Sequence, residues 1–367
     1  MDEITLRRLI HQNPELAFEE YNTQRLIVEF VRGLGLNNIL TLGTGVLVFL
    51  ERREHEPYVI VRAEMDALPI PEETDYPFRA SNGRMHACGH DFHIAAVCWA
   101  LRRIVEEDKR GNYLFVFQPA EESGAGARKI VEHITRWDCD VKAAVAMHVT
   151  DEYPAGVVAS RPGPLFSASC EVNVRVEGRS AHVAQHRLGR DALKSAVMFL
   201  NRVYAWDWKD DLVWFGRLLA GQIRNVVAGE ALIEGTVRVS ETERLHGVIE
   251  VLQSFAREVE DETGVKVSVN PAAVYPEVMI DEGLLSVLRR VCEENGIEYV
   301  ECERKLTAED FGYFSRHFRT LMFWFGVRQK PRIEGLHSPR FLPADELIPV
   351  AGDLLVHLLD SMSEARV

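Results

Sequence analysis

The pattern of apolar and polar positions along the chain predicts an alternation of strands and helices. Continuous apolar runs, typical of strands buried on both faces, occur at residues 45–50, 58–70, 112–122, 143–150 and 321–327. Helical spacing of apolar residues is found at 2–34, where Pro14 marks a break between two helices, and again at 93–107. We therefore expect an α/β fold with a mixed, mainly parallel sheet flanked by helices.

A different pattern fills the middle of the chain. Strict alternation of apolar and polar residues, typical of strands with one exposed face, occurs at residues 169–178, 231–240 and 265–271. Helical patterns separate these strands, and from about residue 277 the chain returns to helix and continuous apolar strand. This order predicts an inserted, smaller α+β domain with an open-faced sheet. The expected boundaries are 1–166 and 277–367 for the larger domain and 167–276 for the insertion.

Composition and charge narrow the classes of function. A chain of 367 residues is longer than one hydrophobic core usually supports, which agrees with two domains. The net charge of −14 argues against nucleic acid and against an anionic membrane surface as partners. The chain has no run of 18 apolar residues, no signal-type start and no CxxC spacing among its six cysteines. We therefore expect a cytoplasmic protein with reduced thiols and no membrane span.

Side chains that can bind metal ions gather near the ends of the apolar runs. They are Glu64, Asp66, Cys88, His90, Glu121, Glu122, His148 and His337. Any one of these segments alone is more often a solvated polar stretch than a ligand site. Several of them following buried strands indicate one shared site, because the carboxyl ends of parallel strands meet at one edge of a sheet. Imidazole, carboxylate and thiolate are the groups that hold Zn²⁺, Mn²⁺ or Co²⁺ in proteins.

The stretch MHACGHDFH (85–93) also permits a second interpretation. Cys88 could be a thiol nucleophile that His86 or His90 activates. That chemistry needs one cysteine, one base and one orienting group. It leaves the glutamates near residue 121 and the histidines at 148 and 337 without a role, whereas a metal site uses them all. We favour the metal site.

Six motifs carry a resemblance to a known family. They are RAEMDALPI, MHACGHDFHIA, FQPAEESGAGA, GRSAHVAQ, AEDFGYF and GLHSPRFLPADE, and they run collinearly from about residue 8 to residue 355. In this order they resemble the M20 metallopeptidases, and in particular the amidohydrolase branch with the hippurate hydrolases, the auxin-conjugate hydrolases and the N-acetyldiaminopimelate deacetylases. Within this branch, DEYPAGVVASRPGPLFSAS looks most like the deacetylases.

The resemblance implies a centre with one or two divalent metal ions, which could be Zn, Mn, Co or Ni. The residues that match the ligands of the family are Cys88, His90, Glu122, His148 and His337. Glu121 matches the general base. Neighbouring residues on an extended segment point in opposite directions, so one glutamate could hold metal while the other holds water. Cys88 is a candidate for the ligand that two ions share.

Five further positions correspond to residues of this family that support the metal centre or bind the substrate. Asp66 matches an aspartate that orients a ligand from behind. Glu64 stands where the branch usually carries aspartate, and its extra methylene keeps the charge but moves the carboxylate by about one C–C bond. His182 matches a histidine that reaches toward the active site of the partner subunit, where it could stabilise an oxyanion. Asn225 and Arg238 match positions that hold the α-carboxylate of the substrate. The resemblance also implies a homodimer formed through the inserted domain, which would act as a lid.

The expected activity is hydrolysis of the amide bond of an N-acyl amino acid. The motifs favour N-acetyl-diaminopimelate, which would yield diaminopimelate for lysine biosynthesis. A broad N-acyl-amino-acid amidohydrolase or a carboxypeptidase of the same chemistry is the alternative. A third possibility, from another class of function, is a metal-binding protein without catalytic activity. The adjacent pair Glu121 and Glu122 argues against it, because such a protein could lose the base and keep the ligands.

Overall fold

The computed structural model describes residues 1–122, 126–137, 140–329 and 331–364. The chain forms two compact units. The first consists of Met1–Leu165, Val278–Glu303 and Tyr313–Val367, and the second of Phe166–Glu277 and Arg304–Gly312. The sequence pattern predicts residues 304–312 in the larger domain. They group with the second unit because Lys305 forms a bridge with Phe166 and its carbonyl accepts hydrogen bonds from the backbone and side chain of Ser167.

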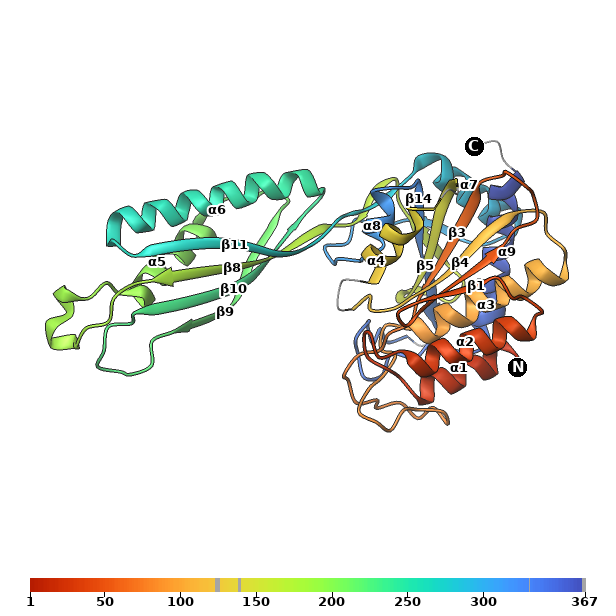
Figure 1. Ribbon diagram of the computed structural model, residues 1–367, viewed down its shortest axis with the longest axis horizontal. Coiled ribbons are helices and arrows are strands. Elements are labelled where there is room, and N and C mark those ends of the chain that lie inside the picture. The colour runs from red at the N-terminus through yellow and green to blue at the C-terminus, as the bar shows by residue number, and fades with distance from the viewer. Residues whose placement is uncertain (123–125, 138–139, 330, 365–367) are drawn as a thin grey trace. The chain divides into compact units, whose positions relative to one another are not determined.

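The first unit contains an eight-stranded sheet with helices packed against it (Figure 1). Its strands and the short β7–β12 pair are β1 (Ile39–Leu42), β2 (Gly45–Leu50), β3 (Tyr58–Glu64), β4 (Asn112–Gln118), β5 (Val141–Pro154), β6 (Val158–Ser160), β7 (Gly163–Phe166), β12 (Val278–Ile280), β13 (Tyr299–Glu301) and β14 (Thr320–Arg328). Its helices are α1 (Glu3–Gln12), α2 (Tyr21–Gly33), α3 (His90–Glu106), α4 (Gly126–Ile134), α7 (Glu282–Glu294), α8 (Gly312–Ser315) and α9 (Leu347–Glu364).

The order of strands in this sheet is β1-β2-β4-β3-β5-β14-β6-β13. Its four central strands, β4, β3, β5 and β14, run parallel to one another, and antiparallel pairs occur only toward the two sides. The mixed, mainly parallel α/β sheet that the sequence predicts is therefore confirmed. Because the central strands share one direction, their carboxyl ends lie along one edge of the sheet.

Burial on both faces explains why these strands read as continuous apolar runs. Every residue of β4 is buried, and α3 is buried at most of its positions because it packs against α9 and α1. Gly89, in the MHACGHDFH stretch, directly precedes helix α3 and has φ of 85°. A Cβ at this position would lie 2.5 Å from Cγ2 of Val149, so only glycine fits between Cys88 and His90.

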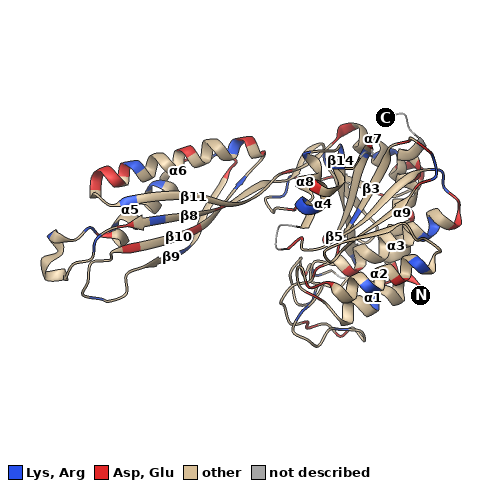
Figure 2. Cartoon of the chain, in the orientation of Figure 1, with Lys and Arg blue, Asp and Glu red and all other residues tan. Residues whose placement is uncertain are grey.

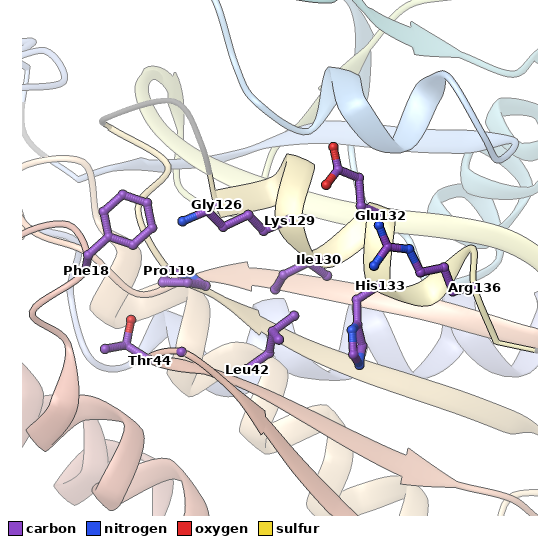
Figure 3. A pocket seen from close by; sticks show the side chains of 11 residues that line it. Phe18, Leu42, Thr44, Pro119, Gly126, Lys129, Ile130, Glu132, His133 and Arg136 are labelled. Carbon is purple, nitrogen blue, oxygen red and sulfur yellow. The ribbon is translucent and has the colours of Figure 1, made fainter.

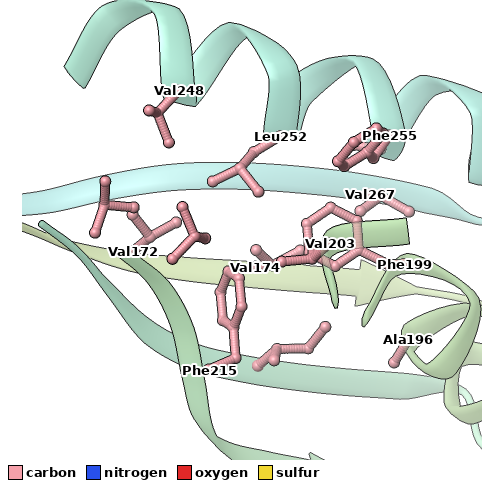
Figure 4. Packing of buried hydrophobic residues seen from close by; sticks show 14 of the residues in the cluster. Val172, Val174, Ala196, Phe199, Val203, Phe215, Val248, Leu252, Phe255 and Val267 are labelled. Carbon is pink, nitrogen blue, oxygen red and sulfur yellow. The ribbon is translucent and has the colours of Figure 1, made fainter. Parts of the chain in front are cut away.

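The second unit is a four-stranded antiparallel sheet with helices on one face. Its elements are β8 (Ala168–Glu177), η1 (Val183–Leu188), α5 (Ala192–Ala205), β9 (Leu212–Ala220), β10 (Glu230–Val239), α6 (Thr242–Thr263) and β11 (Lys266–Tyr275). The order of strands is β11-β8-β10-β9. Figure 4 shows the core, in which Phe199 of α5 and Leu252 of α6 meet the inward side chains of the sheet, such as Val174.

Figure 2 marks acidic and basic residues on the helices of both units, for example on α6. In the described part of the chain, no helix is both long enough and apolar enough to cross a bilayer.

Candidate metal centre

Three neighbouring strands and one helix start deliver the candidate ligands. Strand β3 ends at Glu64 and leads to Asp66, strand β4 leads to the glutamate pair after Gln118, and His148 lies within β5. Helix α3 begins at His90. Since β4, β3 and β5 are parallel neighbours, residues far apart in sequence come together at their carboxyl ends.

His90 presents an unused nitrogen to the interior of the site. Its Nδ1 lies 2.8 Å from the backbone carbonyl of Asp66, and because a carbonyl can only accept, Nδ1 carries the proton. Nε2 of His90 is buried and has no hydrogen-bond partner. A buried imidazole nitrogen without a hydrogen-bond partner, on a ring that a carbonyl orients from behind, is the arrangement of a metal-binding histidine.

His148 is oriented in the same way. Its Nδ1 lies 2.8 Å from the carbonyl of Val149 and therefore donates, which leaves Nε2 as an acceptor. This Nε2 is 3.4 Å from Sγ of Cys88. Burial and the neighbouring His93 hold the pKa of His148 well below its ordinary value. The ring is therefore neutral, as a metal ligand must be.

Glu122 and His337 complete the group. Oε1 of Glu122 is buried and lacks a hydrogen bond, although Nε2 of the half-exposed His337 is 3.2 Å away. The ligand atoms of Cys88, His90 and Glu122 all lie within 4.8 Å of one another. Through these contacts the five residues predicted as metal ligands, including His148, form one continuous cluster.

Without a metal ion, the charge of the cluster depends on which of its residues carry a proton. Burial lowers the pKa of His90, but Asp66, Glu64 and Glu122 outweigh it and raise this pKa to about 10. Burial raises the pKa of Glu122, but His337 and His90 lower it by more, so this pKa lies below its ordinary value. A cation placed among these residues would replace the proton of His90 as the partner of the carboxylates.

The two glutamates after β4 stand in a turn and not, as expected, on an extended segment. Asp66 holds this turn, because its carboxylate accepts the backbone N–H of Glu121 at 3.1 Å and that of Glu122 at 2.9 Å. The residue before them, Ala120, has φ of 55°, in the left-handed region that non-glycine residues rarely occupy. Its N–H donates to Oε1 of Glu20 at 2.9 Å.

Glu64 belongs to a separate layer behind the cluster. Its carboxylate contacts Arg62 and lies 2.7 Å from Nδ1 of His93, and all three side chains are buried. Nε2 of His93 accepts the backbone N–H of Val149 at 3.0 Å. Glu64, His90, His93 and His148 have ligand-type atoms within 4.8 Å of one another, but both ring nitrogens of His93 are already engaged. This second group therefore fits a supporting layer better than a metal site.

The loop that carries His337 is anchored by Asp151, a residue that no sequence motif singles out. The carboxylate of Asp151 accepts the backbone N–H of Glu334 at 2.6 Å and that of Gly335 at 3.1 Å. His337 itself has φ of 63°, and its N–H donates to the carbonyl of Ala87 at 2.9 Å, one residue before Cys88. Glu20 is a second residue of this kind. No spacing or motif relates it to a turn 100 positions away.

The remaining three predicted site residues lie in the second unit. His182 and Asn225 are exposed and close together, since the N–H of Val183 donates to the carbonyl of Asn225 at 3.0 Å. Arg238 lies near the other end of the sheet, opposite Ser169, whereas Glu230 at the end of β10 nearest Asn225 pairs with Glu177. Eight strand residues span roughly 26 Å at about 3.3 Å each. One chain therefore keeps Arg238 apart from His182 and Asn225.

The donor set fits divalent transition metals. It offers imidazole nitrogen, a thiol and carboxylate, which suit ions such as Zn²⁺, Co²⁺ or Mn²⁺. The unpartnered Nε2 of His90 and Oε1 of Glu122 are the buried polar atoms that such an ion would satisfy.

Comparison with known proteins agrees with this geometry. The model of peptidase family M20/M25/M40 matches residues 60–361. The N-acetyldiaminopimelate deacetylase of Anoxybacillus flavithermus is 34% identical over 96% of this chain and 95% of its own length. The YXEP protein of Bacillus subtilis, described as a dinuclear metal binding peptidase from the M20 family, is 28% identical with a TM-score of 0.88, covering 99% and 98% of the two chains.

A putative aminohydrolase from methicillin resistant Staphylococcus aureus shares the fold, with a TM-score of 0.92 at 24% identity over 99% of this chain and 96% of its own. The match of the family model covers most of the chain, and the deacetylase relative aligns over nearly its full length. The chain belongs to the peptidase family M20/M25/M40.

Proposed function

We propose that the protein is a metal-dependent amidohydrolase that removes the acetyl group from N-acetyl-diaminopimelate. The relatives that are named N-acetyldiaminopimelate deacetylase align over almost the whole chain and support this substrate. The observation that carries the proposal is the pair of buried polar atoms Nε2 of His90, which has no hydrogen-bond partner, and Oε1 of Glu122, which has only the ion pair with His337. Leaving such atoms unpaired costs free energy of about 1–3 kcal/mol each, which a bound cation would recover.

Cys88, His90, Glu122, His148 and His337 would hold one or two divalent ions. Such ions, when bound, supply the Lewis acidity that makes water a nucleophile near neutral pH. The chain supplies the orientation of its ligands, through the carbonyls behind His90 and His148. It also supplies the loop anchor Asp151, which keeps His337 beside Glu122.

Glu121 is the proposed general base. Asp66 grips the backbone N–H groups of both glutamates, so that the carboxylate of Glu121 starts from a fixed backbone next to a ligand. In this role Glu121 takes a proton from water during attack on the amide carbonyl and gives it to the leaving amine. A base that is held in position speeds the reaction because it need not be reoriented when the proton moves.

Arg238 is the proposed partner of the substrate carboxylate. Its Nη1 is buried without a hydrogen-bond partner, and burial lowers the pKa of its guanidinium. A carboxylate would offer Arg238 two parallel charge-assisted hydrogen bonds. His182 and Asn225, also proposed to contact substrate, lie too far along the same sheet to join Arg238 within one chain. They would meet the substrate only if they came from a second subunit.

We propose a homodimer through the second unit for this reason. Strand β9 is an edge of the four-stranded sheet, and Trp214 and Leu219 on it are 58% and 47% exposed. An exposed edge strand with large apolar side chains is a ready surface for pairing with another chain. Light scattering should give the mass of a dimer for the wild type and a smaller mass for Trp214→Glu.

Rates of hydrolysis measured with several N-acyl amino acids distinguish between the possible activities. Metal-reconstituted protein should release acetate from N-acetyl-diaminopimelate faster than benzoate from hippurate or acetate from other N-acetyl amino acids. Faster turnover of those compounds would instead establish a broad N-acyl-amino-acid amidohydrolase. Absence of turnover in protein that holds its metal would leave only a binding function.

A further inference from the structure

A hollow of about 380 Å³ opens on the surface of the first unit (Figure 3), and none of the five proposed ligands lines it. Its apolar lining comes from Phe18, Leu42, Pro119 and Ile130. Its polar lining comes from Lys129, Glu132, His133 and Arg136, which lie on α4 and the turn that follows it. A volume of this size is in the range of sites for small organic molecules.

The charges of this hollow do not balance. Nζ of Lys129 lies 4.5 Å from the ring centroid of Phe18, and no carboxylate of the described residues lies within 4 Å of Lys129 or Arg136. The one acid in the lining, Glu132, is 2.9 Å from Nε of Arg128, which does not line the hollow. Among the described residues, the exposed Lys129 and Arg136 therefore have no carboxylate partner beside the apolar floor, in a protein whose net charge is −14. Figure 2 marks the basic positions of α4 in blue.

The same hollow touches the backbone that carries the glutamate pair. Pro119, in its wall, directly precedes Ala120, and Gly126, also in the wall, packs so closely that a Cβ would lie 1.6 Å from the carbonyl oxygen of Pro119. Thr44, another lining residue, donates its hydroxyl proton to Glu20 at 2.5 Å, and Glu20 in turn accepts the N–H of Ala120. A molecule in the hollow would therefore contact two residues that fix this turn.

We propose that the hollow is a binding site for a small amphipathic carboxylate, distinct from the substrate site. The carboxylate would contact Lys129 or Arg136, which lie at opposite ends of the hollow (Figure 3), and the hydrocarbon part would cover Leu42 and Ile130 between them. A charge-assisted contact to a cation that has no carboxylate partner among the described residues favours an anion over a neutral or cationic molecule. The apolar floor favours a body of several carbons, since each buried methylene adds to the affinity.

The test measures binding of hexanoate and benzoate to the metal-loaded protein by calorimetry, with acetate and hexylamine as matched probes. Hexanoate should bind saturably and at least about ten-fold more tightly than acetate, because four further methylenes reach the apolar floor. Hexylamine should not bind. In Lys129→Glu/Arg136→Glu the affinity for hexanoate should fall by at least about ten-fold, because both cations are reversed.

Two control variants keep the proposal falsifiable. Arg128→Glu changes the charge of the same helix outside the hollow and should leave hexanoate binding intact. Arg238→Ala removes the proposed contact for the substrate carboxylate and should also leave it intact. Binding that persists in the double variant, or that disappears in Arg238→Ala, would place the carboxylate elsewhere and overturn the proposal. Lack of saturable binding up to about 10 mM hexanoate would do so as well, since such affinity is below that of a weak specific site.

Discussion

The carboxylate of Glu20 accepts the backbone N–H of Ala120 at 2.9 Å, and it does so in full burial. Burial raises the pKa of Glu20, which has the hydroxyl of Thr44 as its second donor. Ala120 has the left-handed φ of 55° that turns the chain into Glu121 and Glu122. A non-glycine residue persists in such a conformation when its surroundings over-determine it, and Glu20 provides one of these constraints.

Replacing Glu20 by Gln should therefore misplace the glutamate pair without removing any ligand. The amide can accept the N–H of Ala120 only through its oxygen, and its NH2 group then faces the hydroxyl of Thr44, which must turn from donor to acceptor. The pair of hydrogen bonds that holds Ala120 is thereby weakened. We expect kcat to fall by about 10–100-fold, the cost of a small displacement of a catalytic group, with metal content close to that of the wild type. Glu19→Gln is the control, because Glu19 is exposed and pairs with Arg84. Equal kinetics of the two variants would contradict a positioning role for Glu20.

Gly89 provides a test of the spacing between Cys88 and His90. Gly89→Ala introduces a Cβ 2.5 Å from Cγ2 of Val149 at φ of 85°. We expect lower metal content and a lower midpoint of thermal unfolding. Gly83→Ala is the matched control, since Gly83 has φ of 77° but open space around its Cβ position. It should show only the strain of about 1–2 kcal/mol for the left-handed backbone and full metal content.

The division of labour between base and ligands can be tested with two variants. Glu121→Gln should keep its metal and lose turnover by several orders of magnitude, because the amide cannot accept the proton of water. Cys88→Ser should instead lower metal content, as measured by atomic emission after dialysis. If Cys88→Ser lost activity with its metal unchanged, or if the wild type stayed active after exhaustive chelation, Cys88 would be a nucleophile.

The pH dependence of stability should contain a contribution from His11. Burial lowers the pKa of His11, but Asp91 and Glu72, at 2.9 and 3.2 Å, outweigh it and raise the pKa to about 9. Arg7, which also contacts Asp91, and the ring of Tyr76 are the other groups that face it. Because the folded pKa exceeds the unfolded value of 6.5, this stabilisation is complete below pH 6.5 and disappears as the pH rises through about 9.

Urea unfolding of the wild type and of His11→Asn at several pH values checks this prediction. The free energy of unfolding of the wild type should fall by up to about 3 kcal/mol more than that of the variant between pH 6.5 and 9. Parallel curves for the two proteins over this range would show that His11 does not hold a proton in the folded state.

The sequence could predict the sheet and the meeting of the ligands because both follow from local patterns. Buried apolar runs that end in acids or histidine identify parallel strands and their common edge, which is where Glu122 and His148 are found. The choice of Nε2 over Nδ1 as the free nitrogen of His90 depends on the carbonyl of Asp66 and needs the structure.

The supporting contacts could not be predicted, because they join residues without a shared pattern. Glu20 and Ala120 are 100 positions apart, and Asp151 anchors a loop more than 180 positions further on. The turn at Glu121 also differs from the extended segment that strand β4 suggested, since nothing in PAEE announces a left-handed alanine. The separation of Asn225 from Arg238 within one chain likewise follows from strand register alone.

The most direct test of the account is anomalous X-ray diffraction from crystals loaded with Mn²⁺ or Zn²⁺. The account predicts anomalous density beside Sγ of Cys88, Nε2 of His90 and the carboxylate of Glu122, with His148 and His337 completing the coordination. Density that is held by Glu64 and His93 instead, or no density near these residues in metal-loaded and active protein, would contradict it.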